Sequence, residues 1–303
     1  MQSLFAGCRK AKLGPLVDMW PSLFDRRTNV CRSLARRPFV ASYSVRELFG
    51  GDMRPCRICV FAFSLTLAAA SLLAQTQTSV PYIGCSSDGQ TGPYPAAKGS
   101  PKSVSLPPTT ADQLAWYEYN GDAGRFGTLG PRGWNCFVTI GSDGWTLYIA
   151  PEMLDSAKLL EDRNWKGFSG PAIQLSESDG GTSGRFEVAR MVARVFPAHR
   201  DYARKIIAEG FGPASDYPFG PFPSDHLAYK GKNLVEFITP AHRNGLGTMS
   251  WLLPSDQPIT GFALLTIGPD IDTELLHLSF RLPPSLTHLG AALIQQAEAN
   301  ASS

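Results

Sequence analysis

The stretch GPRGWNCFVTIGSDGWTLYIAPE, residues 130–152, decides how this chain folds. Apolar residues recur at every second position from Cys136 to Ile140, and again from Trp145 to Ile149. A period of two places such residues on one face of a β-strand. The tetrapeptide GSDG, residues 141–144, separates the two runs and is typical of a tight turn. The stretch therefore predicts a β-hairpin with one apolar face.

Shorter patterns extend from this hairpin in both directions. Strands are predicted at 103–106, 172–176, 261–268 and 274–282, and a strand pair is predicted around Gly231 within 227–240. Helices are predicted from Thr109 or Thr110 to about Tyr119, after a cap at Thr182 or Ser183, across 198–210, and across 283–301. Mixed strands with interspersed helices indicate the α+β class. We expect a single domain over 103–303, built on a mainly antiparallel sheet with helices packed on one face.

The residues before this domain divide into three segments. Residues 75–102 are polar and rich in glycine and proline, and we expect them to form an extended N-terminal arm. Residues 53–74, MRPCRICVFAFSLTLAAASLLA, have the basic start, apolar core and small-residue end of a secretory signal peptide. Residues 1–52 carry nine Lys and Arg against four acids and no sustained apolar period. We expect them to be a disordered upstream extension, with Met53 as the true start.

The leader predicts that the protein is exported to the periplasm or the medium. Cleavage is expected between Ala74 and Gln75, where the polar sequence QTQTSVP begins, and cleavage after Ala70 is the alternative. A membrane anchor through 58–73 also stays open as an alternative. Its 16 residues are fewer than the roughly 20 that a transmembrane helix needs. We therefore expect no stable membrane insertion after the leader is removed.

The cysteine count changes once the leader is removed. Of six cysteines, only Cys85 and Cys136 lie beyond residue 74. In an oxidising compartment they most simply form one disulfide. The disulfide would close a loop of about 50 residues, which stabilises the folded protein by roughly 3–4 kcal/mol on the chain-entropy estimate. Two buried thiols, or a lipid-modified Cys85, are the alternatives.

Charge excludes some classes of partner. Residues 75–303 hold 17 Lys and Arg against 22 Asp and Glu, a net charge of −5, so the basic character of the whole chain lies in the segments before them. A mildly acidic domain without a basic cluster lacks the electrostatic footprint of nucleic-acid binding. It also lacks the polybasic segment that holds proteins to anionic lipid.

Two long strings carry a resemblance. They are GPRGWNCFVTIGSDGWTLYIAPE and SGPAIQLSESDGGTSGRFEVARMVARVFP, together with the shorter ASDYPFGPFPSDHLAYK and GLGTMSWL. On these residues the chain resembles a family of uncharacterised exported bacterial proteins. The resemblance extends over most of the chain beyond the leader. It implies export, but it transfers no activity and no catalytic residues.

Most candidate catalytic and ligand motifs are incomplete. GFSGPA resembles a serine nucleophile loop, but all five histidines follow Ser169, and the G-x-S-x-G motif of α/β-hydrolases is absent. PDIDTE, residues 269–274, spaces three acids like calcium ligands without the rest of a calcium loop. SDGGTSGRF, residues 178–186, precedes a helix but lacks the P-loop ending. We therefore expect no cofactor and no metal site.

Two further sets leave a functional role open. A carboxylate pair could be drawn from five acids, Glu118, Glu152, Glu177, Asp179 and Glu236. A saccharide-stacking surface could be formed by Trp134, Trp145 and Tyr148. The sequence favours an exported, non-catalytic protein of unknown biochemical activity, in a binding or envelope role, with a saccharide or protein partner. A secreted hydrolase that uses a carboxylate pair is the alternative; a deep cleft with two facing acids, or a strongly perturbed histidine, would favour it.

Overall fold

The structure is a computed structural model that describes residues 77–268 and 272–301. The expected extension at 1–52, the leader at 53–74, the Ala74–Gln75 cleavage position and the alternative anchor at 58–73 all lie outside the described residues. All described residues belong to one compact unit. None of the helices in this part of the chain is long and apolar enough to cross a membrane.

The predicted hairpin is confirmed. Strands β7 (Asn135–Gly141) and β8 (Gly144–Ala150) pair in antiparallel register, with Cys136 opposite Ile149. Only Ser142 and Asp143 join them, and Gly144 has a φ of +135°, which glycine adopts without strain. The prediction of a single apolar face is wrong, because Phe137 and Tyr148 are also buried on the opposite face.

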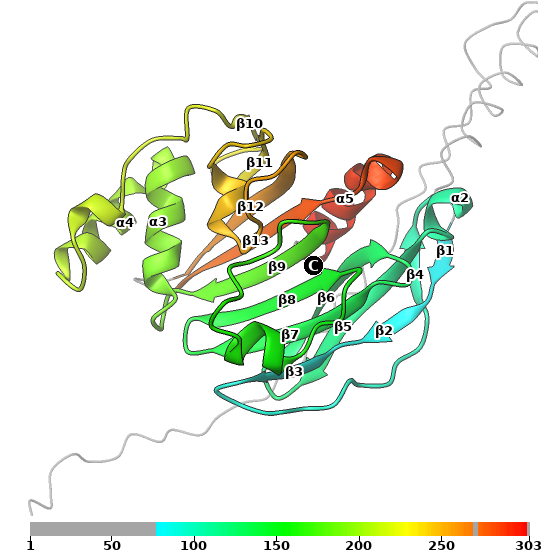
Figure 1. Ribbon diagram of the computed structural model, residues 1–303. Coiled ribbons are helices and arrows are strands. Elements are labelled where there is room, and N and C mark those ends of the chain that lie inside the picture. Colours follow the sequence, from blue (N-terminus) through cyan, green and yellow to red (C-terminus); the bar gives the residue numbers. More distant parts are fainter. Residues whose placement is uncertain (1–76, 269–271, 302–303) are drawn as a thin grey trace, which may run out of the picture. The chain divides into compact units, whose positions relative to one another are not determined.

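The hairpin lies within an eight-stranded sheet (Figure 1). The strand order is β10-β11-β12-β13-β9-β8-β7-β3, and every neighbouring pair is antiparallel except β3 with β7. The remaining strands of this sheet are β3 (Ser86–Gly89), β9 (Ala172–Asp179), β10 (His226–Tyr229), β11 (Leu234–Thr239), β12 (Ile259–Ile267) and β13 (Thr273–Arg281). The strands predicted at 172–176, 227–240, 261–268 and 274–282 are thereby confirmed.

Two smaller sheets complete the strands. One has the order β2-β5-β6, and the other pairs β1 with β4. Their bounds are β1 (Gln77–Val80), β2 (Tyr82–Gly84), β4 (Lys102–Ser105), β5 (Leu114–Gly121) and β6 (Gly124–Pro131). The helix predicted to run to about Tyr119 is wrong. Helix α2 (Pro108–Ala111) has a single turn, and the aromatic-rich run that follows becomes β5, whose first six residues are all buried.

The segment expected to be an arm contains the three strands β1, β2 and β3 in near succession. They pair with β4, β5 and β7, so this one segment contacts all three sheets. Cys85 lies between β2 and β3, where the chain passes from the three-stranded to the eight-stranded sheet. The predicted disulfide from Cys85 to Cys136 on β7 is present.

Both faces of the large sheet are covered. On one face, Val138, Leu147 and Leu278 join a core with the three-stranded sheet and α5 (Gly290–Ala301). On the other face, Tyr148 and Leu275 join a core with α3 (Arg185–Val195) and α4 (Arg200–Ala208). The α+β class with a large, mainly antiparallel sheet is confirmed. The expected placement of helices on one face holds for α3 and α4, whereas α5 packs on the opposite face beside the small sheet (Figure 1).

Candidate functional site

A row of polar side chains crosses the sheet face beneath α3. Thr146 on β8 lies directly opposite Ser176 on β9, which lies directly opposite His277 on β13. All three share the alternation of Tyr148 and Leu275, which are buried in the core under α3 and α4. A sheet face covered by a helix is ordinarily apolar. The row is therefore a local departure from the pattern that stabilises the rest of this face.

The row forms the floor of a cleft of about 480 Å³. Gln174 and Ser178, which lie two residues before and after Ser176 on the same face of β9, extend its polar character. Residues of α3 form one wall, and the segment 249–251 forms another. The lining side chains on the floor and walls are Thr146, Gln174, Ser176, Ser178, Leu275, His277, Glu187, Arg190, Met191, Met249, Ser250 and Trp251.

His277 is the most strongly perturbed group of the cleft. Its side chain is buried, and its Nε2 lies 3.0 Å from the Ser279 hydroxyl. Burial lowers the pKa of His277 to about 4, because the charged imidazolium would lose its hydration. At neutral pH the imidazole is uncharged, so the floor offers hydroxyl, amide and neutral ring nitrogen groups.

The charged residues of the cleft lie on its walls and rim. Glu187 and Arg190 form an ion pair one turn apart on α3. Asp143, in the exposed hairpin turn, lies at the rim. Glu177 and Trp145 also border the cleft, but the strand alternation directs their side chains to the opposite face with Leu175. The floor itself therefore carries no charge.

Trp251 forms the lip of the cleft. Its side chain is 47% exposed, although its ring contacts Trp165 with centroids 5.2 Å apart. The Trp251 backbone N–H donates to Oε1 of Gln174 at 2.8 Å. A large exposed aromatic side chain is thus held next to a polar floor by both backbone and ring contacts.

The segment that carries Trp251 is tied to the loop around Ser169. Phe168 forms a parallel bridge with Leu252, and the Phe168 N–H donates to the Trp251 carbonyl at 2.7 Å. The carbonyl of Ser169 accepts a hydrogen bond from buried Arg281 at 3.0 Å. Among the described residues, Ser169 therefore has a structural role, because its carbonyl accepts this hydrogen bond from Arg281.

The structure does not bring Trp134, Trp145 and Tyr148 together. Trp145 is buried against Phe126, with ring centroids 3.5 Å apart, in the core beneath the small sheet. Tyr148 is buried on the other face. Trp134 is half-buried against the first of these cores. The three side chains therefore share no common surface.

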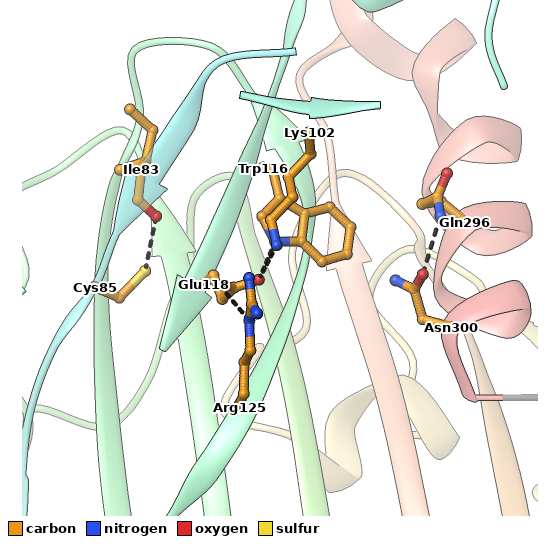
Figure 2. Close-up of polar contacts among 8 residues, drawn as sticks. All are labelled: Ile83, Cys85, Lys102, Trp116, Glu118, Arg125, Gln296 and Asn300. Atoms are coloured by element: carbon orange, nitrogen blue, oxygen red, sulfur yellow. Dashed lines mark hydrogen bonds and ion pairs between the residues drawn. The ribbon is translucent and has the colours of Figure 1, made fainter. Parts of the chain in front are cut away.

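Glu118 is the centre of a charged network. Lys102 and the Trp116 indole N–H reach one carboxylate oxygen, and Arg125 reaches the other, at 2.8–2.9 Å (Figure 2). Only 4% of the Glu118 side chain is exposed. Burial alone would raise its pKa, but the three donors outweigh burial and hold the pKa below its ordinary value. Glu118 is therefore an ionised carboxylate.

Glu118 and Glu177 border the same smaller cleft of about 280 Å³, between β5 and β6 on one side and β8, β9 and β13 on the other. Burial raises the pKa of Glu177, and the charge of Glu274 adds to the shift. The two carboxyl groups thus have pKa values shifted in opposite directions. Aromatic rings also line this cleft, namely Trp116, Phe126 and Trp145.

The other predicted acids have separate structural contacts. Glu152 pairs with Lys158, Glu236 pairs with Lys230, and Asp179 accepts the Gly181 N–H at 2.7 Å. Within PDIDTE, residues 269–271 lie outside the described residues. No group of three or more His, Cys, Asp or Glu that could hold a metal ion occurs within 77–268 and 272–301.

The larger cleft was not predicted from the sequence. Its signal is nevertheless present in β9, where the polar residues Gln174, Ser176 and Ser178 occupy every second position of a strand in the middle of the sheet. No family model, curated protein or solved structure matches this chain.

Proposed function

We propose that the protein is an exported binding protein that holds a small polar ligand in the cleft beneath α3. The polar row Thr146–Ser176–His277 carries this proposal. The Ser176 hydroxyl donates to the His277 carbonyl at 3.5 Å, and Nε2 of His277 lies 3.0 Å from the Ser279 hydroxyl, but an apolar face would still pack better under a helix. A ligand site is typically a concave surface on which a small number of polar groups converge.

Export is supported by the disulfide and by the leader. Disulfides persist in oxidising compartments and are rare in the cytosol. The Cys85–Cys136 bridge therefore agrees with the signal-peptide pattern of 53–74. The net charge of −5 beyond residue 74 makes a nucleic-acid partner unsuitable. A saccharide or a protein of the envelope remains the proposed kind of partner.

Filling the cleft should abolish binding. The variant Ser176→Phe places a ring over the floor, while Ser285→Phe, on an exposed serine outside the cleft, is the matched control. In a thermal-shift screen of sugars, polyols, amino acids and nucleosides, at least one probe should raise the melting temperature of the wild-type protein. A ligand at 100 times its Kd adds about 2.7 kcal/mol, which corresponds to about 5–10 °C.

The Ser285→Phe protein should keep this shift, and the Ser176→Phe protein should lose it. If no polar probe stabilises the wild-type protein, or if Ser176→Phe responds as the wild type does, the cleft is not a binding site.

A hydrolase is the second candidate, and the carboxylate pair of the smaller cleft favours it. Pairs of acids whose environments push their pKa values apart are typical of acid–base catalysis. Glu177, with a raised pKa, would donate a proton to the leaving oxygen. Ionised Glu118 would act as base or nucleophile, although both of its oxygens are occupied by cations and an indole.

The hydrolase predicts a specific loss of turnover. With aryl glycosides as chromogenic substrates, Glu177→Gln should lower kcat at least about 100-fold, because it removes the proton donor. Glu152→Gln, on a half-exposed acid outside this cleft, should leave turnover unchanged. Absence of turnover by the wild-type protein, or full activity of Glu177→Gln, would rule this candidate out.

A further inference from the structure

We infer that the ligand of the cleft beneath α3 is a neutral saccharide that lays one face of a sugar ring on Trp251 and directs its hydroxyl groups to the floor. This inference rests on the proposed binding function and names its ligand class. It combines three properties of the cleft: an uncharged hydrogen-bonding floor, a wall whose two charges form an ion pair, and an exposed aromatic lip.

The floor matches a ligand that both donates and accepts hydrogen bonds. The Thr146 hydroxyl can donate and accept hydrogen bonds, and the Ser176 hydroxyl, which donates to the His277 carbonyl at 3.5 Å, can accept others. The Gln174 amide and the neutral imidazole of His277 add donors and acceptors without net charge. Sugar hydroxyls have the same dual character, whereas carboxylates and phosphates only accept.

The wall disfavours charged ligands. The Arg190 guanidinium is paired with Glu187, so an anion would have to compete with an ion pair that is already formed. An anion would also approach Asp143 at the rim. A cation would find no unpaired carboxylate on the floor, where the described lining side chains are hydroxyl, amide and imidazole groups and the apolar Leu275. Desolvating a charge without a partner is costly.

Trp251 supplies the apolar contact that a saccharide needs. The C–H groups of one sugar face pack on an aromatic ring, and a large rigid ring loses little entropy when it binds. The Trp251 ring is half exposed but held against Trp165, and its backbone is fixed to Gln174 on the cleft floor. The stacking surface and the polar floor are therefore linked by a direct hydrogen bond.

A purely apolar ligand would fit a different part of the molecule. A second groove of about 460 Å³ lies between β10–β12 and α5, and its apolar lining includes Ile238, Phe280 and Ile294. The cleft beneath α3 has no comparable apolar floor. Because the two sites have similar volumes, the polarity of a ligand, rather than its size, would decide which of them it binds.

The test measures Kd by isothermal titration at neutral pH with four kinds of probe. These are neutral trisaccharides (maltotriose, cellotriose and chitotriose), trigalacturonate, spermidine and decanol. At least one neutral trisaccharide should bind with a Kd of 1 mM or tighter, and the other three kinds should bind at least about tenfold more weakly. Trp251→Ala should weaken trisaccharide binding at least about tenfold, and Tyr229→Ala, on a side chain of similar exposure on β10, should not.

Four results would overturn the inference, and they are distinguishable. Binding of only the uronate or the amine, lost in Ser176→Phe, would keep the proposed function and reject the saccharide. Binding of only the alcohol would reject a polar ligand, and with it both proposals. Trisaccharide binding that Trp251→Ala leaves unchanged would reject the stacking surface, and with it the assigned ligand geometry. Binding of no probe, together with no stabilisation in the wider screen, would reject the proposed function itself.

Discussion

Removing the Cys85–Cys136 disulfide should lower the free energy of unfolding by about 4 kcal/mol, the chain-entropy estimate for its separation of 51 residues. In a domain of this size the melting temperature should then fall by about 8–16 °C. The double variant Cys85→Ala/Cys136→Ala tests this in chemical and thermal unfolding. The effect should be large because the bridge joins the segment 77–89 to the centre of the fold.

The pairing around Cys85 shows why hydrogen bonds alone would hold this segment weakly. Strand β2 has three residues paired with β5, and β3 has four paired with β7. Both pairings are parallel, and parallel ladders are slightly less stable per residue than antiparallel ones. Without the bridge, we expect faster amide exchange in β2 and β3 than in β8 and β9.

The reduced wild-type protein provides the control. It should unfold at the same denaturant concentration as the double alanine variant, because both lack the same constraint on the unfolded chain. A double variant that loses less than about 1 kcal/mol would show that tertiary packing, rather than the covalent link, holds the crossing segment.

Local patterns explain which elements could be predicted. The hairpin of β7 and β8 has both its turn and its alternation within 135–150, so neighbouring residues suffice to specify it. The run LAWYEY in β5 has no clear period, because the fold buries it on both faces. A helix and a fully buried strand look alike in such a run. The parallel partners of β2 and β3 lie more than 30 residues away and leave no local trace.

The candidate sites show a similar division. Trp145 and Tyr148 are three residues apart on one strand, and an odd spacing places them on opposite faces. Strand periodicity alone could therefore have excluded their shared surface. By contrast, the floor residues Thr146, Ser176 and His277 come from strands far apart in the chain. Only the strand order β8-β9-β13 makes them neighbours, and nothing in the sequence states that order.

The second large effect should follow from Arg281. This side chain is 2% exposed, and the structure gives it no carboxylate partner among the described residues. Its Nη1 donates to the carbonyls of Phe168, Ser169 and Gly170 at 3.0–3.2 Å, and its Nη2 donates to the Leu253 carbonyl. Burial lowers the pKa of Arg281, and the four carbonyls replace the water around its two Nη atoms, whereas its buried Nε has no hydrogen-bond partner among the described residues.

Arg281→Met should destabilise the protein by about 3–5 kcal/mol, because it removes the charged donor of four hydrogen bonds that join residues 168–170 to Leu253. Arg281→Lys has one ammonium in place of two donor groups, so its free energy of unfolding should lie between those of Arg281→Met and the wild type. Arg243→Met, on an exposed arginine, should change stability by less than about 0.5 kcal/mol. Urea unfolding of the four proteins measures the differences, and equal midpoints for Arg281→Met and the wild type would contradict the role assigned to this side chain.

The same substitution connects stability with the cleft. The carbonyls that Arg281 holds belong to the two segments that meet at the Phe168–Leu252 bridge, and Trp251 is the residue before that bridge. A variant that folds but lacks these contacts should place the Trp251 ring less firmly. Under conditions where Arg281→Lys is fully folded, its affinity for a ligand that stacks on Trp251 should therefore fall, although Arg281 does not line the cleft. Unchanged affinity would mean that the contact of Trp251 with Gln174 is sufficient to hold the lip in place.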